Sequence, residues 1–177
     1  MKKYAISFLF SCLLPFFLNG FDIVKDGQAT AYITAADELP SRVMESIERF
    51  RNDVRVLTAA EIPWRQAKEN KMEIIHIKCN IDSDNVAAIS FPDKNTMRIE
   101  GGTYGLARIF PFLLERFAGV VYLYPGKNGT HYPNIKNLAV PDKSFTFKPV
   151  FDLNRALSNQ DNVFLDTLGA KWAIDCQ

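Results

Sequence analysis

The chain has 177 residues, of which 47% are apolar, with 9 Gly and 9 Pro, and this suits one globular domain. The length excludes a small domain followed by a complete (β/α)₈ barrel, because such a barrel alone takes about 250 residues. The formal charge is +1 and becomes −1 once the two lysines of a leader peptide are removed, so neither nucleic-acid binding nor attachment to a membrane surface is expected.

Residues 1–20 have the layout of a signal peptide. Lys2 and Lys3 precede an apolar run over 4–18, which is shorter than the ~20 residues that span a bilayer. We place the cleavage after Gly20, with an uncleaved N-terminal anchor as the alternative. The protein is therefore expected to be exported, to the periplasm or the extracellular space, with no membrane attachment after cleavage.

The first elements of the mature chain are predicted to be a strand, a helix and a short strand. Residues 29–34 form the first strand. A helix over 37–50 is indicated by buried-type residues at spacings of 4, 4 and 3, with Asp37 or Ser41 able to cap its beginning. Residues 54–57 are predicted to form the short strand.

The middle of the chain predicts one interior strand and one hairpin. Residues 72–79 carry apolar side chains on both faces, which is typical of a strand inside a sheet. Two further strands, 86–91 and 96–100, flank the loop 92–95, whose Pro, Asp and Asn favour a turn.

The strongest helix signal begins after Gly101-Gly-Thr103. Apolar residues recur with helical spacing at Leu106, Ile109, Phe110, Leu113, Leu114 and Phe117. Pro111 lies inside this pattern and is expected to kink the helix or delay its start. Gly119 is suited to end the helix, and a strand is predicted over 120–124.

The remainder is rich in loops from 127 to 149. Short strands are predicted at 145–147 and 150–153, and a last helix at 161–172. The whole order predicts an α/β (α+β) fold, a mixed β-sheet with two main helices packed on it. The sequence leaves the order of the strands open.

Two linked segments carry a family resemblance. The run Thr96-Met-Arg-Ile-Glu-Gly-Gly-Thr-Tyr-Gly-Leu106 is followed by Phe112-Leu-Leu-Glu-Arg-Phe-Ala-Gly-Val-Val-Tyr-Leu-Tyr-Pro-Gly126, then by Gly129-Thr130 and Pro133. This combination resembles the non-catalytic N-terminal domain of bacterial glycoside hydrolases. Such a domain precedes the catalytic barrel in alpha-glucuronidases and beta-hexosaminidases, and precedes uncharacterised barrel domains.

The resemblance implies a division of the chain and a role. Residues 21–148 would be the accessory domain, and 149–177 a linker with the beginning of a truncated barrel, since 149–155 resembles the stretch that leads into the barrel's first strand. The expected function is a non-catalytic accessory domain of a secreted carbohydrate-active protein, whose partner is a catalytic barrel absent from this chain. The alternatives are a stand-alone module that binds a glycan or a protein, and a truncated gene remnant.

No catalytic, metal-binding or cofactor-binding residue is expected. Glycoside hydrolysis needs two facing carboxyl groups, and spacing singles out no pair among Asp82, Asp84, Glu115, Asp152, Asp161 and Asp166. Alternation at Asn80, Asp82 and Asp84 suggests a calcium loop, but Asn85 and Phe91 stand where its Gly and Glu belong. The Gly101–Gly105 turn matches no phosphate-binding fingerprint and is interpreted as a tight structural turn.

The histidines, cysteines and exposed-type aromatics have structural interpretations as well. His76 and His131 have no ligand partner at useful spacing. Cys79 and Cys176 are interpreted as unrelated thiols, with a disulfide between them as the alternative. The aromatic residues that are able to stack on sugars are Trp64, Tyr122, Tyr124, Tyr132 and Trp172, and core or domain-interface positions are favoured for them.

Overall fold

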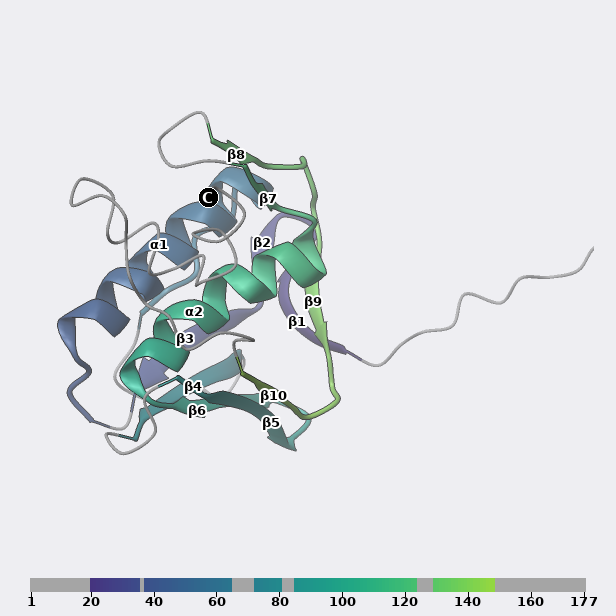
Figure 1. Ribbon diagram of the computed structural model, residues 1–177. Coiled ribbons are helices and arrows are strands. Elements are labelled where there is room, and N and C mark those ends of the chain that lie inside the picture. Colours follow the sequence, from purple (N-terminus) through teal and green to yellow (C-terminus); the bar gives the residue numbers. More distant parts are fainter. Residues whose placement is uncertain (1–19, 36, 65–71, 81–84, 124–128, 149–177) are drawn as a thin grey trace, which may run out of the picture.

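The computed structural model describes residues 20–35, 37–64, 72–80, 85–123 and 129–148. Over these ranges the chain has an α+β fold, in which two helices lie side by side over a mixed sheet (Figure 1). The predicted fold class is confirmed. In the described ranges, no helix is long and apolar enough to cross a membrane.

The main sheet has five strands in the order β10-β5-β6-β4-β3. These strands are β3 (Ala31–Ala35), β4 (Glu73–Cys79), β5 (Ala87–Asp93), β6 (Thr96–Gly101) and β10 (Phe145–Phe147). The parallel neighbours of β4 are β3 and β6, so its predicted interior position is confirmed. The predicted β5–β6 hairpin is also confirmed, and β10 adds an antiparallel edge strand to β5.

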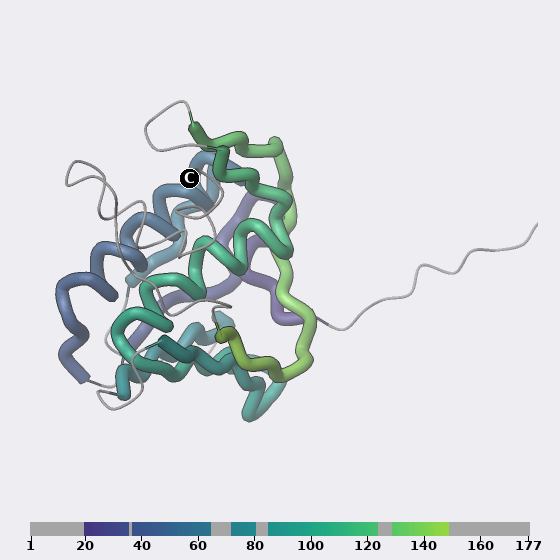
Figure 2. The backbone as a smooth tube through the Cα atoms, in the orientation of Figure 1, coloured from purple at the N-terminus to yellow at the C-terminus, as the bar shows by residue number. Residues whose placement is uncertain are grey.

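A second sheet, with the order β2-β1-β9, was not predicted. It consists of β1 (Gly20–Lys25), β2 (Gln28–Ala29) and β9 (Leu138–Pro141). Strands β1 and β2 are joined by Asp26 and Gly27, whose φ angles of 51° and 75° are typical of a type I′ hairpin turn. Figure 2 shows the first described strand, β1, lying beside β9 from the last part of the described chain. The predicted cleavage point after Gly20 falls inside β1.

Helix α1 (Ser41–Thr58) is longer than predicted, and the strand expected over 54–57 is wrong. Its buried stripe is Val43, Ile47, Phe50, Val54 and Leu57. Because the helical spacing continues without a break through Leu57, one helix buries all five side chains against the same core. The predicted side-chain cap is also wrong. Pro40 is the N-cap residue, and its carbonyl accepts hydrogen bonds from the backbone of Val43 and Met44 at 2.9 and 3.1 Å.

Helix α2 (Thr103–Leu113) follows β6 after one residue, so Pro111 does not delay its start. The helix continues into a π-helical turn, Leu114–Ala118, three residues beyond the proline. Gly119 ends it in the left-handed conformation with φ 70°, as predicted, and its N–H donates to the Leu114 carbonyl. The two helices pack together through Phe50 and Phe110, whose ring centroids are 5.3 Å apart.

The strand predicted over 120–124 is reduced to β7 (Val121–Tyr122), which pairs with β8 (Thr130–His131) in a separate hairpin. The hairpin does not join the main sheet. The predicted strand 150–153 and helix 161–172 lie outside the described residues.

The core lies between the two helices and the main sheet. Strand residues that face the helices are fully buried: Ile33, Ile75, Ile77, Ile89, Met97 and Ile99. Burying each such side chain contributes roughly 1.5–3 kcal/mol. Of the alternate positions, Thr34, His76 and Arg98 are partly or fully exposed, whereas Tyr32 and Ile74 are buried. The two helices cover one face of the sheet, and the opposite face is buried only in part.

Candidate functional site

Of the carboxylates considered for a catalytic pair, the described residues include only Glu115. Glu115 lies in the π-helical turn after α2 with an exposed side chain. The other predicted candidates, Asp82, Asp84, Asp152, Asp161 and Asp166, lie outside the described residues, and so does the centre of the suggested calcium loop.

The Gly101–Gly105 turn packs tightly against the backbone of Val86 and Ala87, where β5 begins. The N–H of Gly102 donates to the Val86 carbonyl at 3.1 Å, so this amide is not directed toward a ligand. A Cβ on Gly101 would lie 2.7 Å from the Ala87 Cα, closer than van der Waals contact allows. The geometry supports the structural interpretation of this turn.

His76, His131 and Cys79 lie apart from one another. His76 is half-buried on β4, and His131 is exposed on β8. Cys79 is a free thiol at the end of β4, with its Sγ 3.9 Å from the Thr103 hydroxyl, while Cys176 lies outside the described residues. In the described part of the chain, no three His, Cys, Asp or Glu side chains are grouped as a metal site.

Two of the predicted aromatics meet a buried carboxyl group that the sequence had not singled out. The hydroxyl of Tyr132 donates to Asp53 Oδ1 at 2.8 Å, and that of Tyr122 lies 3.5 Å from Asp53 Oδ2. Trp64 is half-buried beside Ile33, and Tyr124 and Trp172 lie outside the described residues. These three residues, Asp53, Tyr122 and Tyr132, form what we call the Asp53 cluster. The cluster connects the β7–β8 hairpin to α1.

Burial dominates the electrostatics of this cluster. It raises the pKa of Asp53, against the hydrogen bond from Tyr132 and the charge of Arg49, which lower it. Burial and the Asp53 charge together raise the pKa of Tyr132 to about 12 and raise the pKa of Tyr122 as well. Both tyrosines are thus neutral hydrogen-bond donors at physiological pH, and this suits a structural role for the cluster.

A second perturbed carboxyl group lies at the beginning of β4. Burial, followed by the charge of Asp22, raises the pKa of Glu73 from 4.5 to about 7. Its Oε2 atom is buried and has no hydrogen-bond partner within the described residues. This carboxyl group is therefore poised to change its charge near neutral pH.

Four half-buried phenylalanines form an aromatic face beside the edge strand β10: Phe112, Phe117, Phe145 and Phe147. The ring of Phe112 lies 6.0 Å from that of Phe145 and 5.1 Å from that of Phe147, and Phe117 lies 6.2 Å from Phe145. Strand β10 ends at Phe147, and Lys148 is the last residue that the structure describes.

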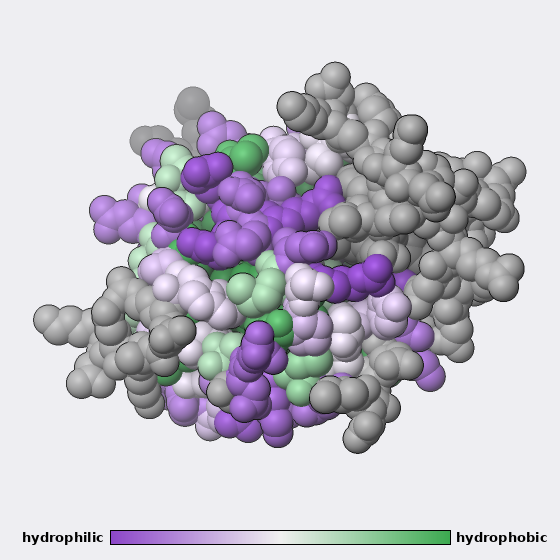
Figure 3. Space-filling model, turned by 90° about the vertical axis from the view of Figure 1, so that its left-hand side faces the viewer, coloured by the Kyte–Doolittle hydropathy of each residue, from purple (hydrophilic) through white to green (hydrophobic). Residues whose placement is uncertain are grey.

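The side of the molecule on which α1 begins has a different character. Figure 3 shows hydrophilic residues across much of this side, with hydrophobic ones scattered among them rather than gathered in one broad area. Exposed residues of α1, such as Glu45, Glu48 and Arg55, are charged, and Glu48 pairs with Arg51 at 2.7 Å. Scattered apolar residues of this kind are ordinary for a solvated surface.

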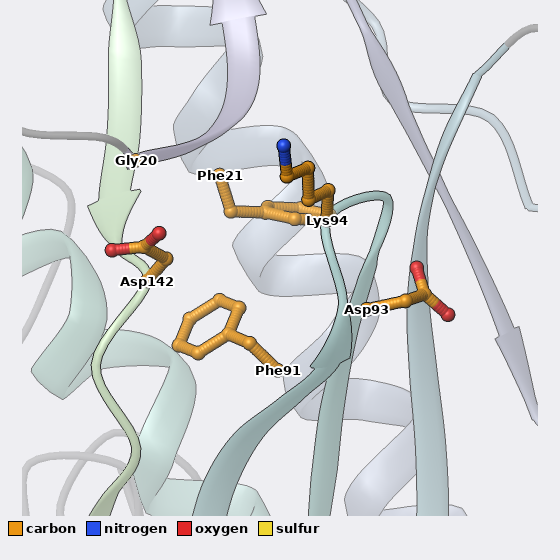
Figure 4. Close-up of a pocket in the computed structure, with 6 residues that line it drawn as sticks. All are labelled: Gly20, Phe21, Phe91, Asp93, Lys94 and Asp142. Carbon is orange, nitrogen blue, oxygen red and sulfur yellow. The ribbon is translucent and has the colours of Figure 1, made fainter.

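A pocket of about 430 Å³ lies between the two sheets, at the β5–β6 hairpin. The described residues that line it are Gly20, Phe21, Phe91, Asp93, Lys94 and Asp142. The rings of Phe21 and Phe91 are 6.1 Å apart at their centroids and inclined by 48°. Figure 4 shows the Asp142 carboxylate beside the space that these rings flank, Lys94 at the turn of the hairpin, and the Asp93 carboxylate directed away.

Sequence reasoning did not single out these pocket residues, because they come from three separate segments. Phe21 belongs to a strand that was not predicted, and Asp142 follows another, β9. Only the turn at 92–95 gave a signal, and it was interpreted as a hairpin loop alone.

Comparison with known proteins gives a likeness to parts of glycoside hydrolases. No protein-family model matches the chain, and no curated protein matches it. Similar solved structures include a GH20 exo-β-N-acetylglucosaminidase from Vibrio harveyi, at 16% identity and a TM-score of 0.45 over 75% of this chain. A GH20 chitobiase from Flavobacterium johnsoniae has 16% identity and a TM-score of 0.43 over 75% of this chain. A GH115 4-O-methyl-α-glucuronidase has 14% identity and a TM-score of 0.43 over 71%.

This chain spans less than a fifth of each of those proteins, covering 17%, 19% and 18% of their chains in the same order. Likeness at this level of identity and TM-score does not assign an activity.

Proposed function

We propose that residues 21–148 form a non-catalytic accessory domain of a secreted carbohydrate-active protein, and that this domain packs against a catalytic barrel encoded after it. Residues 149–177 are then the linker and the beginning of that barrel. The leader over residues 1–20 directs export to the periplasm or the extracellular space.

The observation that carries this proposal is the aromatic face. Four phenylalanine rings gather beside β10 without being fully buried, so covering the rest of each ring would contribute a part of the roughly 1.5–3 kcal/mol that full burial provides. Half-buried aromatic clusters of this kind are typical of surfaces that a partner covers. The partner we assign is the continuation of the same polypeptide, because residues 149–155, which resemble the approach to a barrel's first strand, follow the aromatic face directly.

A second line of support is the local structure of the segment that carries the family resemblance. Strand β6 ends in Gly101-Gly102, α2 begins at Thr103, and Gly119 closes the helical segment. A Cβ at Gly105 would lie 2.9 Å from the Ala87 backbone nitrogen, so the helix approaches the sheet at a distance that only glycine permits. The motif thus builds the scaffold of the domain rather than an active site.

The experiment that tests the proposal is to determine the reading frame beyond the codon for Gln177. We expect several hundred further codons, intact or displaced by a frameshift, that encode a barrel with a pair of carboxylates suited to glycoside hydrolysis. A stop codon followed by unrelated sequence would contradict the accessory role for this chain and leave a stand-alone module as the better description.

A further inference from the structure

We infer that the pocket at the β5–β6 hairpin is a binding site for one uncharged pyranose ring of a glycan. The inference rests on the pocket itself and does not depend on the proposed accessory role. It assigns the site to the space between Phe91 and Asp142, bordered by Phe21 and Lys94 (Figure 4).

The size and the composition of the pocket fit a single sugar. Its volume of about 430 Å³ is at the lower end of the range for small-molecule sites, roughly 300–1,000 Å³. Its lining combines two aromatic rings with a small number of charged groups. A few polar groups that converge on an apolar wall are the usual composition of a ligand site.

The aromatic wall has a half-exposed and a buried part. Phe91 is half-exposed, while Phe21 is only 2% exposed, and the centroids of the two rings are 6.1 Å apart. A phenyl face carries partial negative charge, and the C–H face of a pyranose ring is apolar with slightly positive hydrogens. Phe91 is therefore suited to stack on the C–H face of a sugar.

The polar groups complement the hydroxyls of the same ring. The Asp142 carboxylate accepts hydrogen bonds, and the Lys94 ammonium donates them. Neighbouring hydroxyls of a sugar both donate and accept, so a carboxylate and an ammonium that line one pocket complement them through charge-assisted bonds. The charges of Asp142 and Lys94 cancel, and the Asp93 carboxylate is directed away, so the pocket favours a neutral ring.

Backbone irregularities occur in both sheets beside the pocket. The pairing register shifts between Asp22 and Val24 in β1, and again between Ser90 and Asp93 in β5, the interval that contains Phe91. Bulges are enriched next to functional sites because they re-aim side chains.

The test is a titration of the purified protein with methyl β-D-glucopyranoside and methyl β-D-galactopyranoside, followed by the backbone amide NMR shifts. We expect saturable shifts at Phe91, Lys94 and Asp142 for at least one of the two, with a dissociation constant in the millimolar range that is usual for one small polar ligand.

Two conservative variants connect binding to these residues. Phe91→Leu keeps an apolar side chain but removes the aromatic face, and Asp142→Asn keeps the shape but removes the charge. We expect each variant to raise the dissociation constant by about fivefold or more. Loss of a hydrogen bond to a charged group, or of an aromatic contact, has an effect of about this size. Phe117→Leu, a half-buried phenylalanine outside the pocket, should leave the affinity unchanged.

Absence of saturable shifts with both neutral glycosides in a folded protein would overturn the inference. Binding that Phe91→Leu and Asp142→Asn leave unchanged would also overturn it, because the sugar would then bind elsewhere. Either failure leaves the accessory role standing, since that role is decided by the reading frame.

Discussion

The hydroxyl of Ser46 on α1 donates a hydrogen bond of 2.6 Å to the carbonyl of Ala107 on α2, and both groups are buried. Ala107 is four residues before Pro111, and a helix normally satisfies such a carbonyl with the N–H of the residue four places later. Proline has no N–H, so Ser46 supplies the missing donor from the neighbouring helix. The contact explains how α2 accommodates an internal proline without ending there.

This relationship predicts a coupling between two sites on different helices. Ser46→Ala should destabilise the protein by about 1–3 kcal/mol, because it leaves the Ala107 carbonyl buried and unpaired. In a Pro111→Ala background, the N–H of residue 111 is restored and can donate to the Ala107 carbonyl. Ser46→Ala should then lower the free energy of unfolding by less. Urea unfolding of the wild type, both single variants and the double variant measures this coupling, with Ser41→Ala, an exposed serine on α1, as the control. Equal costs of Ser46→Ala in both backgrounds would contradict the proposed exchange of donors.

The close approach of α2 to β5 predicts that Gly105→Ala is strongly destabilising. Its Cβ would lie 2.9 Å from the Ala87 backbone nitrogen, and backbone on both sides has little room to move. We expect a loss of about 1–3 kcal/mol or more from overpacking. Gly119→Ala is the matched comparison: its φ is +70°, but its Cβ would make an ordinary contact of 3.7 Å with Pro133. Gly119→Ala should lower the free energy of unfolding by about 1 kcal/mol. Chemical unfolding measures both variants, and a larger loss of stability for Gly119→Ala than for Gly105→Ala would refute this explanation.

The Asp53 cluster predicts that Tyr132→Phe loosens the β7–β8 hairpin. The substitution removes the 2.8 Å hydrogen bond to a buried carboxyl group, and should cost about 1–3 kcal/mol. The pKa of Asp53 should rise further, because the bond from Tyr132 lowers it in the wild type. Tyr122→Phe removes a longer contact of 3.5 Å and should cost less. Unfolding curves and the carboxyl NMR shift of Asp53 report the two effects, and an unchanged titration in Tyr132→Phe would argue against the cluster.

Glu73 predicts a pH dependence of stability with a definite sign. Its pKa is raised from 4.5 to about 7, so between these values the folded protein retains a proton that the unfolded chain has released. The contribution of this group to stability therefore decreases as the pH rises from about 4.5 to about 7. Glu73→Gln stays neutral at every pH and should remove this decrease. The difference in stability between the variant and the wild type should therefore be more favourable to the variant at pH 8 than at pH 5. Asp22→Asn should make the decrease smaller, because the Asp22 charge helps to raise the pKa. An identical pH dependence in wild type and Glu73→Gln would rule out this assignment.

The sequence signals that proved reliable were those with a strong local period. The stripe of α2 and the alternation in β4 and the β5–β6 hairpin were read correctly, since burial on one face repeats within a few residues. The helix α1 was shortened by mistake at Phe50, because Val54 and Leu57 by themselves also fit a strand. Continuing the spacing from Val43 would have shown the full helix.

The features that escaped prediction depend on contacts between distant parts of the chain. Strand β1 is short and pairs with β9, more than a hundred residues away, so nothing local marks either strand as part of a sheet. The pocket likewise joins Phe21, Phe91 and Asp142, and Asp53 becomes part of a cluster only when the β7–β8 hairpin folds against α1. Such sites follow from tertiary packing, which periodicity does not encode.

The most direct test of the accessory role is hydrogen–deuterium exchange of the aromatic face in two proteins, this chain and the polypeptide that its complete reading frame encodes. We predict slower exchange in the complete polypeptide over 110–118 and 145–147, because the following domain covers Phe112, Phe117, Phe145 and Phe147, and unchanged exchange at the exposed residues of α1. Equal exchange over the aromatic face in both proteins, or a reading frame that ends at Gln177, would contradict the claim that this face docks a catalytic domain.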